Sequence, residues 1–153
     1  MSHFTTVKTL FSNHEVLIAA LKEAFGWEAE YSQGRLPLFG YLGDDRSLLA
    51  PSNPNYSAPC EIRVSRTQVG HNSNDLGFSL DPTTGHYRAV VSEYDSRHHF
   101  TDLSLQTLTR EYSRQSVLKV AREKNWDIIE VKKGLETTLT LKPKKAKNVL
   151  LQR

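Results

Sequence analysis

Residues 75–143 constrain the fold of this chain more strongly than any other stretch of the sequence. Residues 76–80 and 86–94 are each typical of a β-strand, and the turn signal Asp-Pro-Thr-Thr-Gly at 81–85 joins them. The three segments together predict an antiparallel hairpin. In its second strand, Val90 and Ser92 are expected to point to one face, and Ala89 and Val91 to the other.

A long helix is predicted directly after this hairpin, from about Asp102 to Lys124. Its apolar residues Leu105, Leu108 and Tyr112 recur at helical spacing and define one face. A helix of this length spans ~30 Å, which is enough to cross a sheet of four or five strands. Two further strands are predicted after it, at 126–132 and 137–142.

The first third of the chain repeats this order on a smaller scale. A strand is predicted at 4–10, and Ser12 with Glu15 predicts a capping box that starts a helix. Gly26 is expected to end that helix, and a strand is predicted at 27–31. Gly26-Trp27 and Asn125-Trp126 occupy equivalent joints, which indicates a pseudo-repeat of strand, helix and strand.

These patterns predict an α+β fold with an antiparallel or mixed β-sheet covered on one face by two helices, ferredoxin-like in general layout. We expect a single domain over residues 1–142, with a long loop insertion near 32–74 where glycine and proline are frequent. Within this insertion, residues 59–66 alternate apolar and charged side chains and are predicted to form a strand. Residues 143–153 are expected to be a flexible basic tail.

The net charge of +3 is a property of this end of the chain, because the last twelve residues hold five basic side chains and no acid. Four of the lysines are candidates for weak phosphate contacts of a nucleic acid: Lys142, Lys144, Lys145 and Lys147. The tail has no aromatic residue for base stacking, so base readout is not expected. A solvated chain end is the simpler interpretation of the same residues.

Several kinds of site and location are not predicted. No run of about 18 apolar residues occurs, so we expect no membrane-spanning helix. The first residues lack the order of a secretory signal. Cys60 is the single cysteine, which fits a reducing compartment, and it is more typical of a small core residue than of a nucleophile.

Histidine is the remaining candidate for chemistry. His98 and His99 are adjacent, with His71 and His86 nearby in sequence, and neutral imidazole is a good ligand for zinc or copper. Neighbouring residues of an extended chain point apart, however, and no acid lies at a compact ligand spacing. We therefore predict no catalytic, cofactor-binding or metal-binding residue, and no cofactor. A cryptic enzyme or metal site around the histidines is kept as an alternative.

The landmarks at 1–5 (Met-Ser-His-Phe-Thr), 40–43 (Gly-Tyr-Leu-Gly), 75–78 (Asp-Leu-Gly-Phe), 87–95 and 108–112 occur together in one known group. With them the chain resembles the hypothetical chloroplast reading frame thirty-five family of cyanobacteria and algal plastids, a domain of unknown function. The loop at 48–74 is longer than in typical members. The resemblance implies no catalytic residues, and it implies a plastid stroma or a cyanobacterial cytoplasm.

Our first functional hypothesis is a small non-catalytic interaction or accessory protein. Tyr41 and Tyr56 in the loose middle region are the candidate contacts with an unidentified protein partner. Removal of residues 48–59 is expected to abolish partner binding with little effect on stability. The alternative is a nucleic-acid-associated module that uses the basic tail. A homodimer through the open sheet face is also considered, because two helices can cover only one face.

Overall fold

The computed structural model describes residues 2–134 and 136–144 of the chain. The chain divides into two compact units, Met1–Tyr112 and Ser113–Arg153. A long helix, α4 (Asp102–Lys124), has its first half in one unit and its second half in the other. Within the described ranges, every helix is too short or too polar to traverse a bilayer.

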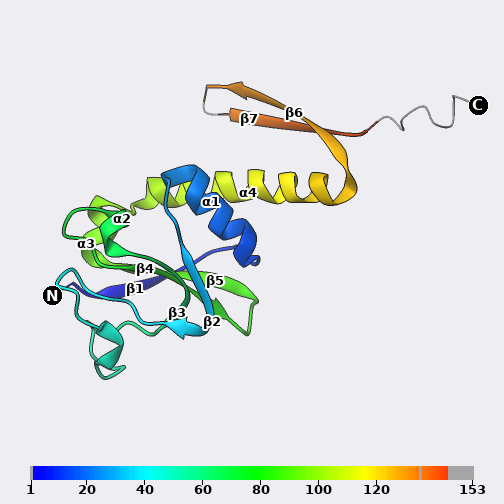
Figure 1. The fold of residues 1–153 in the computed structure, drawn as a ribbon. Coiled ribbons are helices and arrows are strands. Elements are labelled where there is room, and N and C mark those ends of the chain that lie inside the picture. Colours follow the sequence, from blue (N-terminus) through cyan, green and yellow to red (C-terminus); the bar gives the residue numbers. More distant parts are fainter. Residues whose placement is uncertain (1, 135, 145–153) are drawn as a thin grey trace, which may run out of the picture. The chain divides into compact units, whose positions relative to one another are not determined.

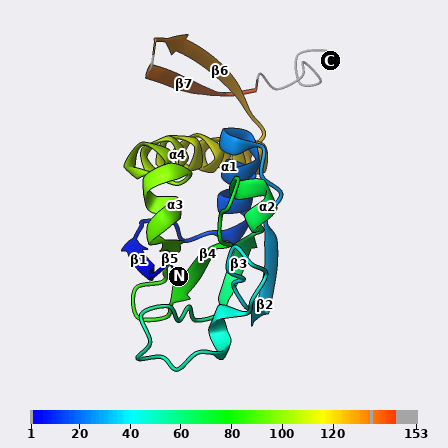
Figure 2. The same ribbon diagram turned by 90° about the vertical axis from the view of Figure 1, so that its left-hand side faces the viewer.

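The first unit contains a five-stranded sheet in which every neighbouring pair is antiparallel. The strand order is β1-β5-β4-β3-β2, so the first two strands of the chain lie at opposite edges, as the two views of Figures 1 and 2 together show. The α+β class and the antiparallel sheet are therefore confirmed, and the ferredoxin-like layout stays a prediction. The strands are β1 (Phe4–Lys8), β2 (Glu30–Leu36), β3 (Cys60–Val64), β4 (Leu76–Asp81) and β5 (His86–Ser92).

Helix α1 (His14–Phe25) carries the chain from one edge of this sheet to the other. The predicted capping box is wrong by one residue, because Asn13 is the N-cap and its side chain accepts the Val16 N–H at 3.1 Å. The Ser12 N–H, which Glu15 was expected to accept, donates instead to the Tyr112 hydroxyl at 3.0 Å. Gly26 ends the helix as predicted, with a left-handed φ of 74°.

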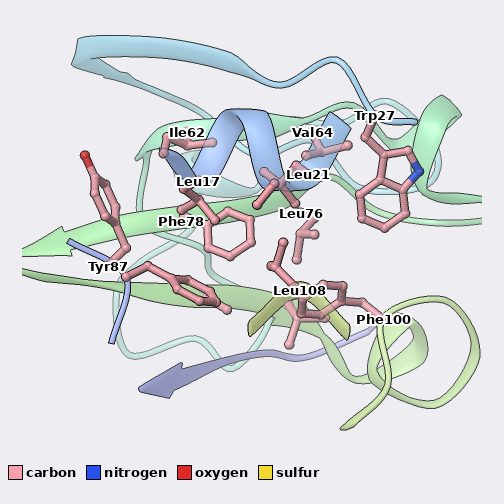
Figure 3. Close-up of a cluster of buried hydrophobic side chains, with 14 of the residues drawn as sticks. Leu17, Leu21, Trp27, Ile62, Val64, Leu76, Phe78, Tyr87, Phe100 and Leu108 are labelled. Carbon is pink, nitrogen blue, oxygen red and sulfur yellow. The ribbon is translucent and has the colours of Figure 1, made fainter. Parts of the chain in front are cut away.

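Helix α1 and the first half of α4 cover one face of the sheet, as the sequence predicts (Figures 1 and 2). Figure 3 shows Leu17 and Leu21 of α1 and Leu108 of α4 pointing toward the sheet residues Leu76 and Phe78. All five side chains are at most 1% exposed. Burial of each such side chain stabilises the fold by roughly 1.5–3 kcal/mol, so this layer is the main core.

The strand predicted at 27–31 begins later, at Glu30, and Trp27 lies in this same core. The predicted continuation of β5 to Tyr94 is wrong, because a short helix, α3 (Glu93–His98), begins there. Ser92 is its N-cap, and the Ser92 hydroxyl oxygen accepts the Asp95 N–H at 3.1 Å. The predicted directions along β5 are confirmed, since Ala89 and Val91 pack in the core and Val90 packs on the other face.

The second face of the sheet is covered in part by the middle of the chain. Leu38 packs there with Cys60 and Val90, and all three are at most 5% exposed. Gly77 lies beneath them, and a Cβ at this position would come within 2.6 Å of the Cys60 Sγ. The face that was expected to be open for a second copy is therefore occupied around Val90 and Gly77. The same middle region carries the short 3-10 helix η1 (Arg46–Leu48) and helix α2 (Arg66–Val69).

The second unit contains the second half of α4 and a separate two-stranded sheet of β6 (Trp126–Lys133) and β7 (Glu136–Pro143). Asn125 ends α4 at a positive φ of 55°, as Gly26 ends α1, so the two predicted joints share their backbone geometry. The strands that follow differ, because β2 joins the five-stranded sheet and β6 pairs only with β7 among the described strands. An ion pair between Arg114 and Glu130 connects helix and hairpin within this unit.

Candidate functional site

A tight turn at residues 40–43 presents two apolar side chains to solvent. The Gly40 N–H donates to the Asp44 carbonyl and the Gly43 N–H donates to the Gly40 carbonyl, each at 2.8 Å. Gly43 has a φ of 83°, a conformation that favours glycine. Between the two glycines, Tyr41 is 42% exposed and Leu42 is 73% exposed. The turn is thus a well-bonded support for an exposed aromatic ring.

A fully buried asparagine holds this turn against the sheet. Asn74 is 0% exposed, and its Oδ1 accepts the Tyr41 N–H at 3.0 Å. Its Nδ2 donates to the Ser92 hydroxyl at 2.9 Å, and its backbone N–H donates to the Asp95 carboxylate at 2.9 Å. A buried amide with all of these partners fixes both the turn and the start of α3.

Asp75, the residue after Asn74, holds the backbone at both Phe39 and Arg66. The Asp75 carboxylate accepts the Phe39 N–H at 2.9 Å through one oxygen and the Arg66 N–H at 2.6 Å through the other. The Asp75 N–H donates to the Phe39 carbonyl at 2.9 Å. Burial raises the pKa of Asp75 above its ordinary value, and it outweighs the opposite effect of the bonds from Phe39 and Arg66. Asp75 therefore positions the backbone of the turn and of α2 together.

Ser73, His99 and Asp95 also meet at this site. The His99 Nδ1 lies 3.1 Å from the Asp95 Oδ1 and 2.8 Å from the Ser73 Oγ. In a catalytic triad, serine and carboxylate contact different ring nitrogens of the histidine. Here both contact Nδ1, so the arrangement does not activate Ser73 as a nucleophile. The ring of His99 instead packs against Gly70, where an added Cβ would lie 2.3 Å from the His99 Cδ2.

The turn at 40–43, helix α2 and residues 70–73 line an open pocket of about 450 Å³ at the surface of the first unit. Arg66 contributes its guanidinium group, which donates to the Tyr41 carbonyl at 2.9 Å, and His71 contributes an exposed imidazole. No carboxylate belongs to the lining that the described residues form. The lining residues, which we call the Tyr41 pocket, are Tyr41, Arg66, Thr67, Gly70, His71, Asn72 and Ser73.

A buried arginine anchors the rest of the middle segment. Arg46 is 1% exposed, and its Nε donates to the Asn55 carbonyl at 3.2 Å. Its Nη2 donates to the Ser2 carbonyl at 3.0 Å, and its guanidinium lies 5.6 Å from the ring centroid of Phe4. The segment around residues 46–57 is therefore packed on the first unit through a buried charge.

The structure separates the two tyrosines predicted as partner contacts. Tyr41 lines the pocket, whereas Tyr56 is half-buried in the turn beyond Asn55 and does not contribute to the lining. Lys142, predicted as a phosphate contact, lies on β7 opposite Asp127, and Lys144 follows the strand in an exposed position. Lys145 and Lys147 lie outside the described residues.

The histidines are likewise divided. His71 lines the pocket and His99 lies behind it, but His98 is exposed on α3 and His86 pairs with Asp81 at the far end of β5. No three potential ligands converge on one point within residues 2–134 and 136–144. Cys60 is 0% exposed, and burial raises the pKa of its thiol to about 12, so it stays protonated at neutral pH.

Asn74, Asp95 and Arg46 were not predicted from the sequence as site residues. A local signal existed for one of them, because Ser92 and Asp95 have the spacing of a residue pair that begins a helix. Comparisons with family models, with curated proteins and with solved structures find no match to this chain. The resemblance to the chloroplast reading frame family therefore stays a prediction.

Proposed function

We propose that this protein is a non-catalytic interaction module that binds an acidic segment of a protein partner at the Tyr41 pocket. The observation that carries the proposal is that the exposed Tyr41 and the Arg66 guanidinium, which donates to the Tyr41 backbone carbonyl, line one concave site whose described lining contains no carboxylate. Arginine and tyrosine are the residue types enriched at the energetic centres of protein interfaces. A carboxylate of the partner would pair with Arg66 while an apolar group packs on Tyr41 and Leu42.

The rigidity of the turn also supports this function. The backbone N–H of Tyr41 and that of Arg66 are each held by a buried side chain, Asn74 and Asp75 respectively. A preformed site loses little conformational entropy when a partner binds, and this favours affinity without a large contact area. Following the resemblance, we place the interaction in a plastid stroma or a cyanobacterial cytoplasm.

Substitutions at the pocket test the proposal. Tagged wild-type protein and the variants Tyr41→Ala and Arg66→Glu are used to capture partners from a cyanobacterial lysate, with quantification of every captured protein. We expect a partner that the wild type enriches and both variants lose by at least about tenfold, which corresponds to about 1.4 kcal/mol of binding free energy. Excess poly-glutamate should compete with this partner for the wild type.

Leu48→Ala is the matched control, because Leu48 is 80% exposed on the same middle segment and lies outside the pocket. Capture should be unchanged in this variant, and thermal unfolding should be similar in all four proteins. Equal capture by the wild type and both pocket variants would contradict the proposal. Capture lost only on truncation after Lys142, with a strong salt dependence, would instead support the nucleic-acid alternative.

Removal of residues 48–59 is a poor test, contrary to the expectation from the sequence. The deletion would remove the Asn55 carbonyl that accepts from Arg46 and the Pro54 carbonyl that accepts the Phe4 N–H at 3.3 Å. A buried guanidinium would lose one of its acceptors, so stability would fall together with any loss of binding.

A further inference from the structure

The hairpin of the second unit leaves one long strand edge without a partner among the described residues. Strand β7 pairs with β6 along all eight of its positions, from Glu136 opposite Lys133 to Pro143 opposite Trp126 (Figure 1). The sheet ends there, because it contains only these two strands within the part of the chain that the structure describes. The outer edge of β7 thus carries backbone N–H and C=O groups in a position to pair with another strand.

An isolated two-stranded sheet is also a marginal structure. Independent stability in water requires three or more strands with an apolar face, or packing against a helix, and this hairpin contacts α4 through the Arg114–Glu130 ion pair. Ile129 and Val131 of β6 remain 47% and 52% exposed, so the hairpin leaves apolar surface uncovered within its own unit. Additional strands at the β7 edge would extend this sheet.

The sequence of β7 is complementary to itself when two copies run antiparallel. With Leu139 facing Leu139 of the second copy, Glu136 faces Lys142 of the second copy at both ends. The residues between are uncharged, and Thr138 faces Thr140 on the face that carries both charges. Opposite charges and Thr–Thr neighbours directly across two strands are favourable pairs. Glu136 and Lys142 are both exposed, and within their own hairpin they lie opposite Lys133 and Asp127.

The outer edge of β6 is not complementary to itself in an antiparallel pair. Asp127 would face Lys133 of a second copy in the corresponding antiparallel arrangement, but Glu130 would then face Glu130 at the centre. Like charges directly opposite each other destabilise a strand pair. Glu130 is in addition paired with Arg114 of its own chain. The charge pattern therefore selects β7 as the edge that fits a second copy.

We propose that two copies of this chain associate through their β7 edges, in antiparallel register about Leu139, into a four-stranded sheet. Glu136 of each copy then pairs with Lys142 of the other. Pro143 has no N–H and ends the pairing directly after Lys142. This dimer uses a strand edge of the second unit and is independent of the Tyr41 pocket of the first.

Charge reversal tests the dimer. The full chain and the variants Glu136→Lys and Lys142→Glu are measured by light scattering over a concentration series. Each variant replaces two attractive pairs of the dimer by two repulsive ones, and we expect the dissociation constant to rise by about tenfold or more. An equimolar mixture of the two variants should recover the dimer mass, because both charge pairs across the mixed interface again join a lysine to a glutamate. A tag on one variant should co-purify the second.

Matched controls come from the other strand. In the hairpin, Asp127 lies opposite Lys142 and Lys133 lies opposite Glu136. Asp127→Lys and Lys133→Glu therefore place like charges across the hairpin, as the β7 variants do, but they leave the charges of β7 unchanged. These controls should dimerise as the wild type does. A wild type that is monomeric up to about 1 mM, the weak limit of specific association, would overturn the proposal. The proposal would also be overturned if Glu136→Lys and Lys142→Glu each dimerise as the wild type does, or if their mixture fails to recover the dimer. Loss of the dimer in Asp127→Lys and Lys133→Glu, with recovery when these two are mixed, would assign the interface to β6 instead.

Discussion

The side-chain amide of Asn74 accepts the backbone N–H of Tyr41 at 3.0 Å, although the two residues lie 33 positions apart in the chain. Because Asn74 is completely buried, the position of the exposed Tyr41 ring depends on a residue that no partner can reach. The turn that presents the ring is fixed from behind, and the ring itself stays free to make contacts.

Replacement of Asn74 by alanine should lower the free energy of unfolding by about 2–3 kcal/mol, since the Tyr41 N–H and the Ser92 hydroxyl each lose a buried partner. Urea denaturation followed by circular dichroism measures the change. Asn72→Gly is the control, because Asn72 is exposed and has a φ of 59° that glycine adopts readily. Similar losses in the two variants would contradict the assigned role of Asn74.

Gly70→Ala should displace the His99 ring. Gly70 has an extended backbone, so the cost is steric, and it arises because the new Cβ would lie 2.3 Å from the His99 Cδ2. We expect a loss of about 1–3 kcal/mol in the free energy of unfolding. Adding His99→Ala should restore part of it in a double-mutant cycle. Gly34→Ala, where the nearest atom is at 3.5 Å, should be harmless. Additive losses from Gly70→Ala and His99→Ala would argue against the contact.

Arg46→Ala should release the middle segment from the first unit. The Asn55 and Ser2 carbonyls lose their donor, and local opening of residues 48–57 becomes easier. Limited proteolysis should cleave this segment about tenfold faster or more, as each loss of about 1.4 kcal/mol in local stability raises the open population tenfold. Arg97→Ala, at a side chain that is 70% exposed, should leave the cleavage rate as in the wild type. If both variants are cleaved equally fast, Arg46 is not the anchor.

The Cys60 thiol should make the fold sensitive to alkaline pH. Burial raises its pKa from 9.0 to about 12, so the unfolded chain loses the proton first and stability falls as the pH rises above 9. The free energy of unfolding should drop by about 2 kcal/mol between neutral pH and about pH 10.5 from this group alone. Tyr87, with its pKa raised to about 12 by burial, adds to the decline.

Cys60→Ala separates the two contributions. The variant should show a shallower decline over the same pH range, in urea denaturation curves recorded at each pH, because the thiol contribution is lost and that of Tyr87 remains. Its absolute stability at neutral pH is lower through the loss of the sulfur contacts, so the slopes are compared rather than the values. An identical pH dependence in the wild type and the variant would show that the thiol titrates in the same way in both states.

The predictable parts of this fold are those whose signals are local. Gly26 ends α1 and the turn at 81–85 joins β4 to β5 because each requires only a few neighbouring residues. The contacts that build the candidate site are of the opposite kind. Asn74 and Asp75 hold Tyr41 and Phe39 across more than thirty positions, and a run of polar residues at 70–75 gives no indication of such partners.

Two errors have a similar origin. The capping box at Ser12 follows a local pattern, but Asn13 caps α1, and the hydroxyl of Tyr112, a hundred positions away, accepts the N–H that the box would have satisfied. The strand pattern at 86–94 continues past Ser92, yet Ser92 and Asp95 turn the chain into α3. In both places a tertiary or capping hydrogen bond outweighs the propensity of the segment. Tyr41 was identified as a contact candidate, but Arg66 and His71 were not placed with it, since only the folded chain brings them together.

The placement of the first two strands at opposite edges of the main sheet has a consequence for how the protein is made. As the ribosome releases the chain from its N-terminus, β1 emerges long before β5, its neighbour among the described strands of the sheet, since Phe4 pairs with Ser92. The first strand must therefore wait, unpaired, until most of the first unit has been translated. Such long-range pairing slows folding and prolongs the time in which a nascent strand is exposed to chaperones and to other chains.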